Sequence, residues 1–300
     1  IKGFDRDKVY DYYKYYYTPS NCTVSIAGNI GNVNKNSLEK LLKKYTHSCG
    51  MKEEHDKPHD KKTICQNITS DFKNPKQAIP ISIQTTPKLK VQKGTDAQQC
   101  AVMIGYPTTN RYNIQDMYAL NIAACVLGGG LSSRLFIEVR EKAGLAYTIS
   151  ADNVFFQDSG LFMITTAIEK NSLLLNKIDD NVKKNKIGGL PIILKVIEDV
   201  LRDGITETEL TLSKTNLVNK LSMSYENTHT IAMYYNEMIM MEQTPMIFID
   251  DFIKGIKDVK LEHVNATIKK YLSFDKMNIC VIGDYTEEQI VDSLKKLFIF

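Results

Sequence analysis

The sequence lacks two patterns that would assign it to a class of protein directly: a long apolar run and closely paired cysteines. No segment approaches the roughly 18 consecutive apolar residues of a membrane helix, so we expect no membrane span. The six cysteines are scattered and none forms a CxxC pair. This spacing favours reduced thiols over a disulfide scaffold. Because a secretory signal pattern is also missing, we expect an intracellular protein, either cytoplasmic or organellar.

An excess of charge of one sign is missing as well. The formal net charge is +3, and the basic residues are spread along the chain without interleaved aromatic residues. A nucleic-acid-binding domain concentrates its Lys and Arg on one face, so we expect no nucleic-acid partner. The chain does contain 43% hydrophobic and 24% charged residues, which is typical of a globular protein. Its 300 residues predict about two domains.

The chain repeats one pattern at a very long interval. Val9 matches Val264 and Gly28 matches Gly283, in both cases 255 residues apart (283 − 28). Each copy is expected to form a helix, then a strand that ends in Gly-Asn or Gly-Asp, then a second helix. A period of this length indicates duplicated domains rather than a solenoid.

The repeat predicts where the domains lie. We expect residues 1–46 to be the C-terminal end of a first domain and residues 89–300 to be a complete second domain. Residues 47–88 are charged and interrupted by proline, which is typical of an interdomain linker. Strands and helices are mixed along the chain, so each domain is predicted as α+β, a mostly antiparallel or mixed sheet packed with helices. The start at Ile1, without a methionine, indicates a piece of a longer protein.

Two individual elements are predicted from their residue patterns. CTVSIAG, residues 22–28, is expected to be a strand. Residues 206–241 are expected to form one long helix that begins at the N-terminal signature TETEL. We expect the methionines of this helix to be core packing; they are Met233, Met238, Met240 and Met241.

The stretch GGGLSSRLFIEVREKAGLAYTIS, residues 128–150, combines a short charged helix with the start of a strand. The glycines at 128–130 and at 144 are expected to let the chain turn sharply at the two ends of the helix. Tyr147 falls at the start of the strand. Taken alone, a tyrosine there fits a core position, where its phenol would need a hydrogen-bond partner.

One arginine of the short helix departs from the charged face. On a wheel of roughly 100° per residue, Arg134 and Lys142 each lie four residues from Glu138, a favourable spacing for ion pairs. Arg140 instead falls with Phe136, at the edge of the apolar arc. An arginine in that place either extends outward or reaches a partner, and the geometry alone leaves both open.

Two segments resemble a known family. LGGGLSSRLFIEVREKAGLAYTISADNVFFQDSGLF, residues 127–162, closely resembles the second-domain signature of the pitrilysin/insulinase family of zinc peptidases, which includes the mitochondrial processing peptidases. YYTPSNCTVSIAGNI, residues 16–30, resembles the end of that family's first domain. The resemblance covers nearly the whole chain and implies tandem peptidase-family domains, in agreement with the internal repeat.

The resemblance implies a role for two residues. In that family an arginine and a tyrosine of the second domain reach across a cavity to a substrate held at the zinc of the first, and the matching positions are Arg140 and Tyr147. A phenol can donate a hydrogen bond to the oxyanion of a tetrahedral intermediate. A guanidinium can hold substrate carbonyl groups through its planar fork.

The family's zinc motif, HxxEH with a further glutamate downstream, is missing from these 300 residues. Only HDKPH, His55 to His59, has two histidines at that spacing, and Pro58 stands where the motif has its glutamate. Proline there removes the general base and breaks a regular helix. We therefore expect no metal site in this segment, zinc in the parent protein, and no hydrolysis by the segment alone.

Two functions remain open from the sequence. In the first, the chain is the C-terminal portion of a zinc-dependent metalloendopeptidase that cleaves peptides or unfolded polypeptides in an interdomain cavity, and the missing N-terminal half carries HxxEH. In the second, it belongs to a non-catalytic partner or structural subunit of a processing-peptidase-like complex, whose homologous subunit carries HxxEH. The presence of both Arg140 and Tyr147 favours an active assembly but fits either chain of one.

Overall fold

The protein, described by a computed structural model, forms two compact units. Unit 1 comprises Ile1–Ile79 and Met223–Met246, and unit 2 comprises Pro80–Ser222 and Ile247–Phe300. The residues whose placement is described are 3–18, 21–29, 34–48, 84–94, 98–174, 187–240 and 246–295.

Unit 2 is built on a mixed sheet of five strands in the spatial order β1-β5-β2-β4-β3. The strands are β1 (Lys88–Lys93), β2 (Gln99–Thr108), β3 (Ala146–Phe155), β4 (Gly160–Glu169) and β5 (Asn278–Gly283). β1 pairs with β5 in parallel, and the other neighbouring pairs are antiparallel. The consecutive strands β3 and β4 pair as a hairpin, as the sequence predicts. The α+β prediction is confirmed.

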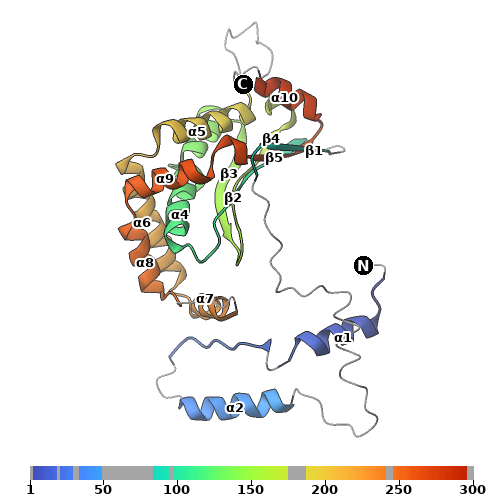
Figure 1. The fold of residues 1–300 in the computed structure, drawn as a ribbon, viewed down its shortest axis with the longest axis vertical. Helices are drawn as coiled ribbons and strands as arrows, with labels where there is room; N and C mark the ends of the chain where they lie inside the picture. Colours follow the sequence, from blue (N-terminus) through green and yellow to red (C-terminus); the bar gives the residue numbers. More distant parts are fainter. Residues whose placement is uncertain are drawn as a thin grey trace. The chain divides into compact units, whose positions relative to one another are not determined.

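Helices cover one face of this sheet (Figure 1). The helices of unit 2 are α4 (Ile114–Gly128), α5 (Gly189–Asp203), α6 (Glu207–Ser224), α8 (Ile249–Asp258), α9 (Leu261–Tyr271) and α10 (Glu287–Lys295). In the part of the chain that the structure describes, no helix combines the length and the apolar character needed to cross a bilayer.

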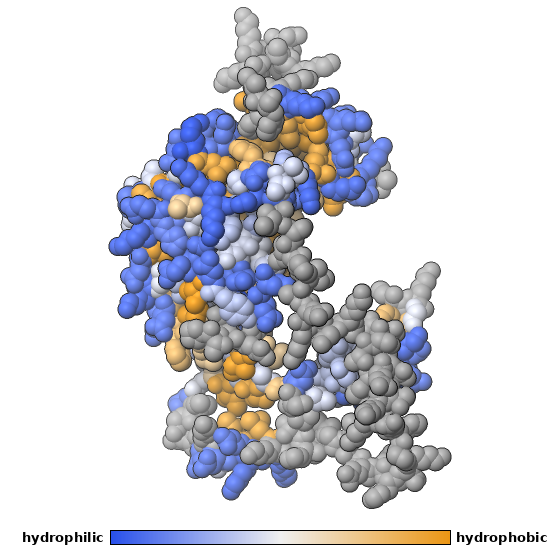
Figure 2. Space-filling model, viewed as in Figure 1, coloured by the Kyte–Doolittle hydropathy of each residue, from blue (hydrophilic) through white to orange (hydrophobic). Residues whose placement is uncertain are grey.

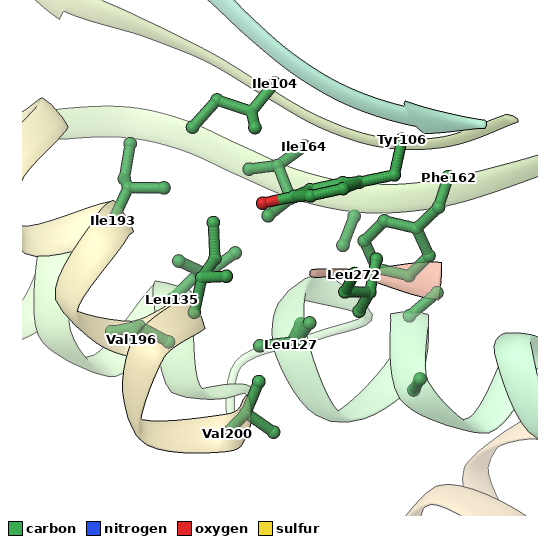
Figure 3. Packing of buried hydrophobic residues seen from close by; sticks show 14 of the residues in the cluster. Ile104, Tyr106, Leu127, Leu135, Phe162, Ile164, Ile193, Val196, Val200 and Leu272 are labelled. Atoms are coloured by element: carbon green, nitrogen blue, oxygen red, sulfur yellow. The ribbon is translucent and has the colours of Figure 1, made fainter. Parts of the chain in front are cut away.

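The core of unit 2 lies between the sheet and these helices. Along β4, every second residue from Gly160 to Ile168 is buried, because alternate side chains of a strand point to opposite faces. Figure 3 shows Tyr106 and Phe162 extending from the sheet toward the helices, and both are fully buried. Burial of one such side chain contributes about 1.5–3 kcal/mol. The sheet therefore has one packed face, and residues of the opposite face are exposed on β2 and β5 and half-buried on β4.

Asp116 links α4 to α9 through a cluster of polar side chains. Its carboxylate accepts hydrogen bonds from Lys270 Nζ at 2.7 Å and Tyr271 Oη at 2.8 Å, and lies 3.0 Å from His263 Nε2. Burial acts to raise the pKa of Asp116, but the hydrogen bonds from these partners outweigh it and lower the pKa to about 2. The charged form of this carboxylate therefore stabilises the fold.

We expect Asp116→Asn to reduce the acid sensitivity of folding. The folded-state pKa of Asp116 is below the reference value of 3.8, so its contribution, on the order of 2 kcal/mol, is present above about pH 4 and is lost as the pH falls through the folded pKa near 2. Chemical denaturation over this range should show a smaller loss of unfolding free energy in the variant than in the wild type. Asp292→Asn, at an exposed position of α10, is the control. Identical pH profiles for Asp116→Asn and wild type would contradict the assignment.

Unit 1 contains helices α1 (Arg6–Tyr16), α2 (Lys35–Ser48) and α7 (Thr228–Met240). α1 begins as its sequence predicts, because the Asp5 side chain accepts a hydrogen bond from the backbone N–H of Lys8 at 2.9 Å. The prediction of a strand at residues 22–28 is wrong, because these residues are described and do not form a strand. A strand exists only through a hydrogen-bonded neighbour, and the described residues of unit 1 contain no strand that could pair with it.

The internal repeat is visible in the positions of the helices. α1 and α9 occupy the same positions 255 residues apart (261 − 6 and 271 − 16), and the starts of α2 and α10 are 252 residues apart (287 − 35). The environments differ, however: Val264 is fully buried, whereas the matching Val9 is 55% exposed. In the described part of the chain, only the second copy is packed on a sheet.

The long helix expected over residues 206–241 is in fact two helices, α6 and α7. The Asn227 side chain accepts a hydrogen bond from the backbone N–H of His229 at 2.8 Å. Asparagine is a strong N-cap, so it begins a new helix where the pattern of apolar residues continues without a break. The sequence therefore showed the helical segments but not the interruption.

The methionines of α7 are not core residues in the described part of unit 1. Met233 is 55% exposed and Met240 is 54% exposed, Met238 is half-buried, and α7 contains no buried residue. Figure 2 shows hydrophobic residues at the surface of α7. A stripe of apolar residues becomes core only where another element covers it, and no described strand of unit 1 does so. Met241 lies outside the described residues.

Candidate functional site

The segment from residue 136 to residue 142 is a π-helix, Phe136–Lys142, where the sequence predicts an ordinary short helix. Gly144 ends it with a positive φ of 66°. The backbone N–H of Gly144 donates to the carbonyl of Arg140 at 3.1 Å, and that of Leu145 donates to the carbonyl of Val139 at 2.9 Å. Together with the positive φ of Gly144, these two bonds turn the chain at the end of the helix, so the expected turn at Gly144 is confirmed. π-helices are rare overall, and those that occur are often found at functional sites.

Gly128 has a different role from the sharp turn that we expected. No glycine at 128–130 has a positive φ in the left-handed region. A Cβ atom on Gly128 would lie 2.2 Å from the backbone nitrogen of Ala151. Glycine is therefore needed at this position because the C-terminal end of α4 packs directly against the backbone of β3.

Arg134 pairs with Glu209, and the predicted pair with Glu138 does not form. Its Nε and Nη2 donate to the two carboxylate oxygens of Glu209 at 2.6 and 2.8 Å, and Nη2 also donates to the carbonyl of Gly204 at 2.9 Å. This bidentate ion pair joins the start of the helical segment that leads into the π-helix to the start of α6. The predicted pair of Lys142 with Glu138 is confirmed at 2.7 Å.

Arg140 and Tyr147 lie in contact. The guanidinium carbon of Arg140 is 5.0 Å from the centre of the Tyr147 ring and 4.7 Å from the centre of the Phe136 ring. A cation over aromatic faces is attracted by their quadrupoles, and the flat guanidinium is held in place between them. Within the described residues its N–H groups have no hydrogen bond or ion pair with another side chain. The four-residue spacing of Phe136 from Arg140 was the signal in the sequence for this contact.

A β-bulge places Tyr147 on the exposed face of the sheet. Ala146 pairs with Ile168 and Ile149 pairs with Thr166, so β3 advances three residues while β4 advances two. Ile149 faces the core, and regular alternation would turn Tyr147 to the core as well. The extra residue shifts it to the other face, where it is 78% exposed. The expectation that a tyrosine at this place in the strand is a core residue is therefore wrong.

Two hollows in the surface meet at Arg140. One, of about 300 Å³, is lined by Arg140 and Tyr147 together with Gln99 and Glu169. The other, of about 550 Å³, is lined by Arg140 and Phe136 together with the glycine run at 128–130. The N–H groups of Arg140 and the hydroxyl of Tyr147 are therefore accessible to a ligand.

The chemistry of this arrangement is that of binding. A free guanidinium and a free phenol can donate hydrogen bonds to carbonyl oxygens or to an oxyanion. Among the residues that the structure describes, no cluster of His, Cys, Asp or Glu could hold a metal ion. His55 and His59 lie outside the described residues. The described part of the chain thus holds donors but no metal-activated nucleophile.

The chain is similar to bacterial zinc proteases. It is 26% identical over 296 residues to an uncharacterised zinc protease of Mycobacterium leprae, and 27% identical over 279 residues to the uncharacterised zinc protease YmxG of Bacillus subtilis. These alignments cover 96% and 92% of this chain but only 57% of each relative. The chain therefore spans a little more than half the length of the curated relatives that it matches.

Solved structures share its fold. A protease from Helicobacter pylori aligns with a TM-score of 0.69 at 18% identity, over 94% of this chain and 60% of that one. A peptidase M16 inactive domain from Pseudomonas fluorescens aligns with a TM-score of 0.58 at 24% identity, over 75% of this chain and 50% of that one. A chain of Complex III2 from Candida albicans aligns with a TM-score of 0.55 at 13% identity, over 78% of this chain and 56% of that one.

The family assignment rests on the sequence match. Residues 3–217 match the family model described as the Peptidase M16 inactive domain. This range includes the glycine run, the π-helix, Arg140 and Tyr147, and it confirms the resemblance that residues 127–162 indicate. The chain belongs to the M16 peptidase family, the family of pitrilysin and insulinase, and carries its inactive domain.

Proposed function

We propose that this chain is the C-terminal portion of a zinc-dependent metalloendopeptidase that cleaves peptides in an interdomain cavity. In this proposal Arg140 and Tyr147 bind the substrate and stabilise the transition state. One observation carries it: the guanidinium of Arg140 lies over two aromatic rings, next to the exposed hydroxyl of Tyr147, and its N–H groups have no side-chain partner among the described residues. A buried structural arginine or tyrosine has its hydrogen bonds satisfied within the fold, whereas these two side chains line an open hollow together.

The two side chains have separate tasks. The Tyr147 hydroxyl donates a hydrogen bond to the oxygen that becomes negatively charged when water attacks the peptide carbonyl. The fork of Arg140 donates to carbonyl oxygens of the bound peptide and orients it. Water activation requires a zinc ion and a general base, and we propose that an HxxEH motif outside this chain supplies both.

We also propose the domain boundaries that follow from the repeat. Residues 1–46 would complete a first, catalytic-type domain, residues 47–88 would be the linker, and residues 89–300 would form the inactive-type domain. The partners are then a peptide or unfolded polypeptide and either the preceding half of the protein or a homologous subunit with HxxEH. Val9 of α1 is exposed, whereas the matching Val264 of α9 is buried. This difference supports the proposal that α1 packs against an element outside the described residues.

The alternative is a non-catalytic partner or structural subunit. The structural likeness to a chain of Complex III2 from Candida albicans is the observation that favours it, because the fold also occurs outside peptidases. A purely structural subunit does not need free donors in an open hollow, so the Arg140 site favours an active assembly. The full-length sequence of the protein distinguishes the two, since it either contains HxxEH or does not.

Arg140→Lys tests the role of the guanidinium. Lysine keeps the charge but loses the planar set of N–H donors that guanidinium offers. Hydrogen bonds to charged groups contribute about 1.5–3 kcal/mol, so we expect kcat/KM for peptide cleavage to fall by at least about tenfold. The measurement uses the full-length protein or the reconstituted pair, with a thermal melt of each variant. Unchanged kcat/KM would contradict the role.

The matched control is Arg202→Lys. The Arg202 side chain is 58% exposed and pairs with Asp199 and Asp203 at the end of α5, outside both hollows. We expect its kcat/KM to stay close to that of the wild type. Arg134→Lys is a poor control, because Arg134 makes the bidentate pair with Glu209.

A further inference from the structure

We propose that Thr166 is a positioning residue for Tyr147 and acts through the β-bulge. This inference rests on the proposed function of Tyr147. The bulge is the reason that Tyr147 reaches the exposed face, because β3 in regular alternation would turn the residue toward the core. Whatever stabilises the bulge therefore also determines where the phenol lies.

The hydrogen bond of Thr166 lies at the bulge itself. Residues 147 and 148 have no Cα partner in the register between β3 and β4, so Thr148 belongs to the bulge. The hydroxyl of Thr166, on β4, donates to this carbonyl at 2.8 Å. Thr166 is only 8% exposed and faces the core side of β4. One buried hydroxyl of β4 is thus hydrogen-bonded directly to the backbone of the bulge.

A threonine is unexpected at this position without such a role. The core-facing positions of β4 on either side of it are Ile164 and Ile168, and both are buried. A hydroxyl placed among them is unfavourable unless it is hydrogen-bonded. Loss of the hydroxyl would remove this hydrogen bond from the bulge, which favours a regular strand or a loosened bulge over the observed one.

Two variants separate positioning from packing. Thr166→Val keeps the shape and deletes the hydroxyl, whereas Thr166→Ser keeps the hydroxyl. In the full-length protein or the reconstituted pair, we expect Thr166→Val to lower kcat by about tenfold with little change in KM, and Thr166→Ser to retain most of kcat. In a Tyr147→Phe background, Thr166→Val should cause no further loss, because the two residues act on one step.

Amide hydrogen exchange gives a readout that does not depend on activity. Exchange in the segment 145–150 should become faster in Thr166→Val and stay unchanged in Thr215→Val. The control deletes a hydroxyl that donates to the carbonyl of Thr211 in α6, outside both hollows. If Tyr147→Phe has normal turnover, the proposed function fails, and the exchange result still decides whether Thr166 holds the bulge. Unchanged exchange at 145–150 in Thr166→Val, or an equal loss of kcat in the Tyr147→Phe background, would overturn the inference.

Discussion

Tyr147→Phe is expected to lower the rate of peptide cleavage by about 100-fold and to leave thermal unfolding unchanged. Removal of one hydrogen-bond donor to an oxyanion costs about 3 kcal/mol of transition-state stabilisation, which corresponds to this factor in rate. Stability should not change, because the side chain is 78% exposed and its hydroxyl has no hydrogen-bond partner in the described part of the protein. The phenylalanine ring can still lie beside the Arg140 guanidinium.

The measurement is kcat and KM for a peptide substrate, with the full-length protein or the chain combined with its HxxEH-bearing subunit. The control is Tyr17→Phe, at a tyrosine that is 72% exposed in the described residues and lies outside both hollows. We expect the loss to appear in kcat, since the interaction forms only in the transition state. Normal turnover in Tyr147→Phe, or a loss of activity matched by a loss of fold, would remove the catalytic assignment.

Gly128→Ala is expected to destabilise unit 2 by about 3 kcal/mol. A Cβ atom at this position would lie 2.2 Å from the backbone nitrogen of Ala151 and 2.7 Å from the backbone carbon of Ser150. Backbone atoms of a strand that is paired in a sheet cannot move aside as the end of a flexible side chain can, so α4 or β3 has to shift. Overpacking of this kind costs about 1–3 kcal/mol or more. For a domain of this size, the melting temperature should fall by roughly 6–12 °C.

The neighbouring glycine offers a matched control. A Cβ atom on Gly130 would meet nothing within 4 Å, and Gly130 has no positive φ. Gly130→Ala should therefore melt within a few degrees of the wild type. Equal stability of the two variants in calorimetry would show that the close approach of α4 to β3 is not what requires glycine at position 128.

The sequence by itself determined the family and the class of fold. The run from residue 127 to residue 162 is long and specific, and a family match over residues 3–217 agrees with it. The 255-residue repeat predicted two equivalent helices, and α1 and α9 occupy the corresponding positions. Such signals are readable in the sequence because the signature run, and each copy of the repeat taken by itself, is a local pattern of residues.

The tertiary structure decided which residues of the site face solvent and which partners they have. Arg134 had Glu138 at the favourable local spacing, yet it pairs with Glu209, 75 residues away, because the tertiary fold brings the starts of two helices together. A helical wheel drawn with the period of an α-helix also could not show that residues 136–142 form a π-helix.

The clearest example is Tyr147. Its sequence context fits a buried strand residue equally well, and only the register of β3 against β4 turns it outward. That register depends on one extra residue in the bulge and, in our proposal, on the hydroxyl of Thr166, which lies 18 residues after its partner Thr148. Pairing between strands is a long-range interaction with no period of its own in the sequence, so the exposed phenol beside Arg140 is a property of the folded sheet alone.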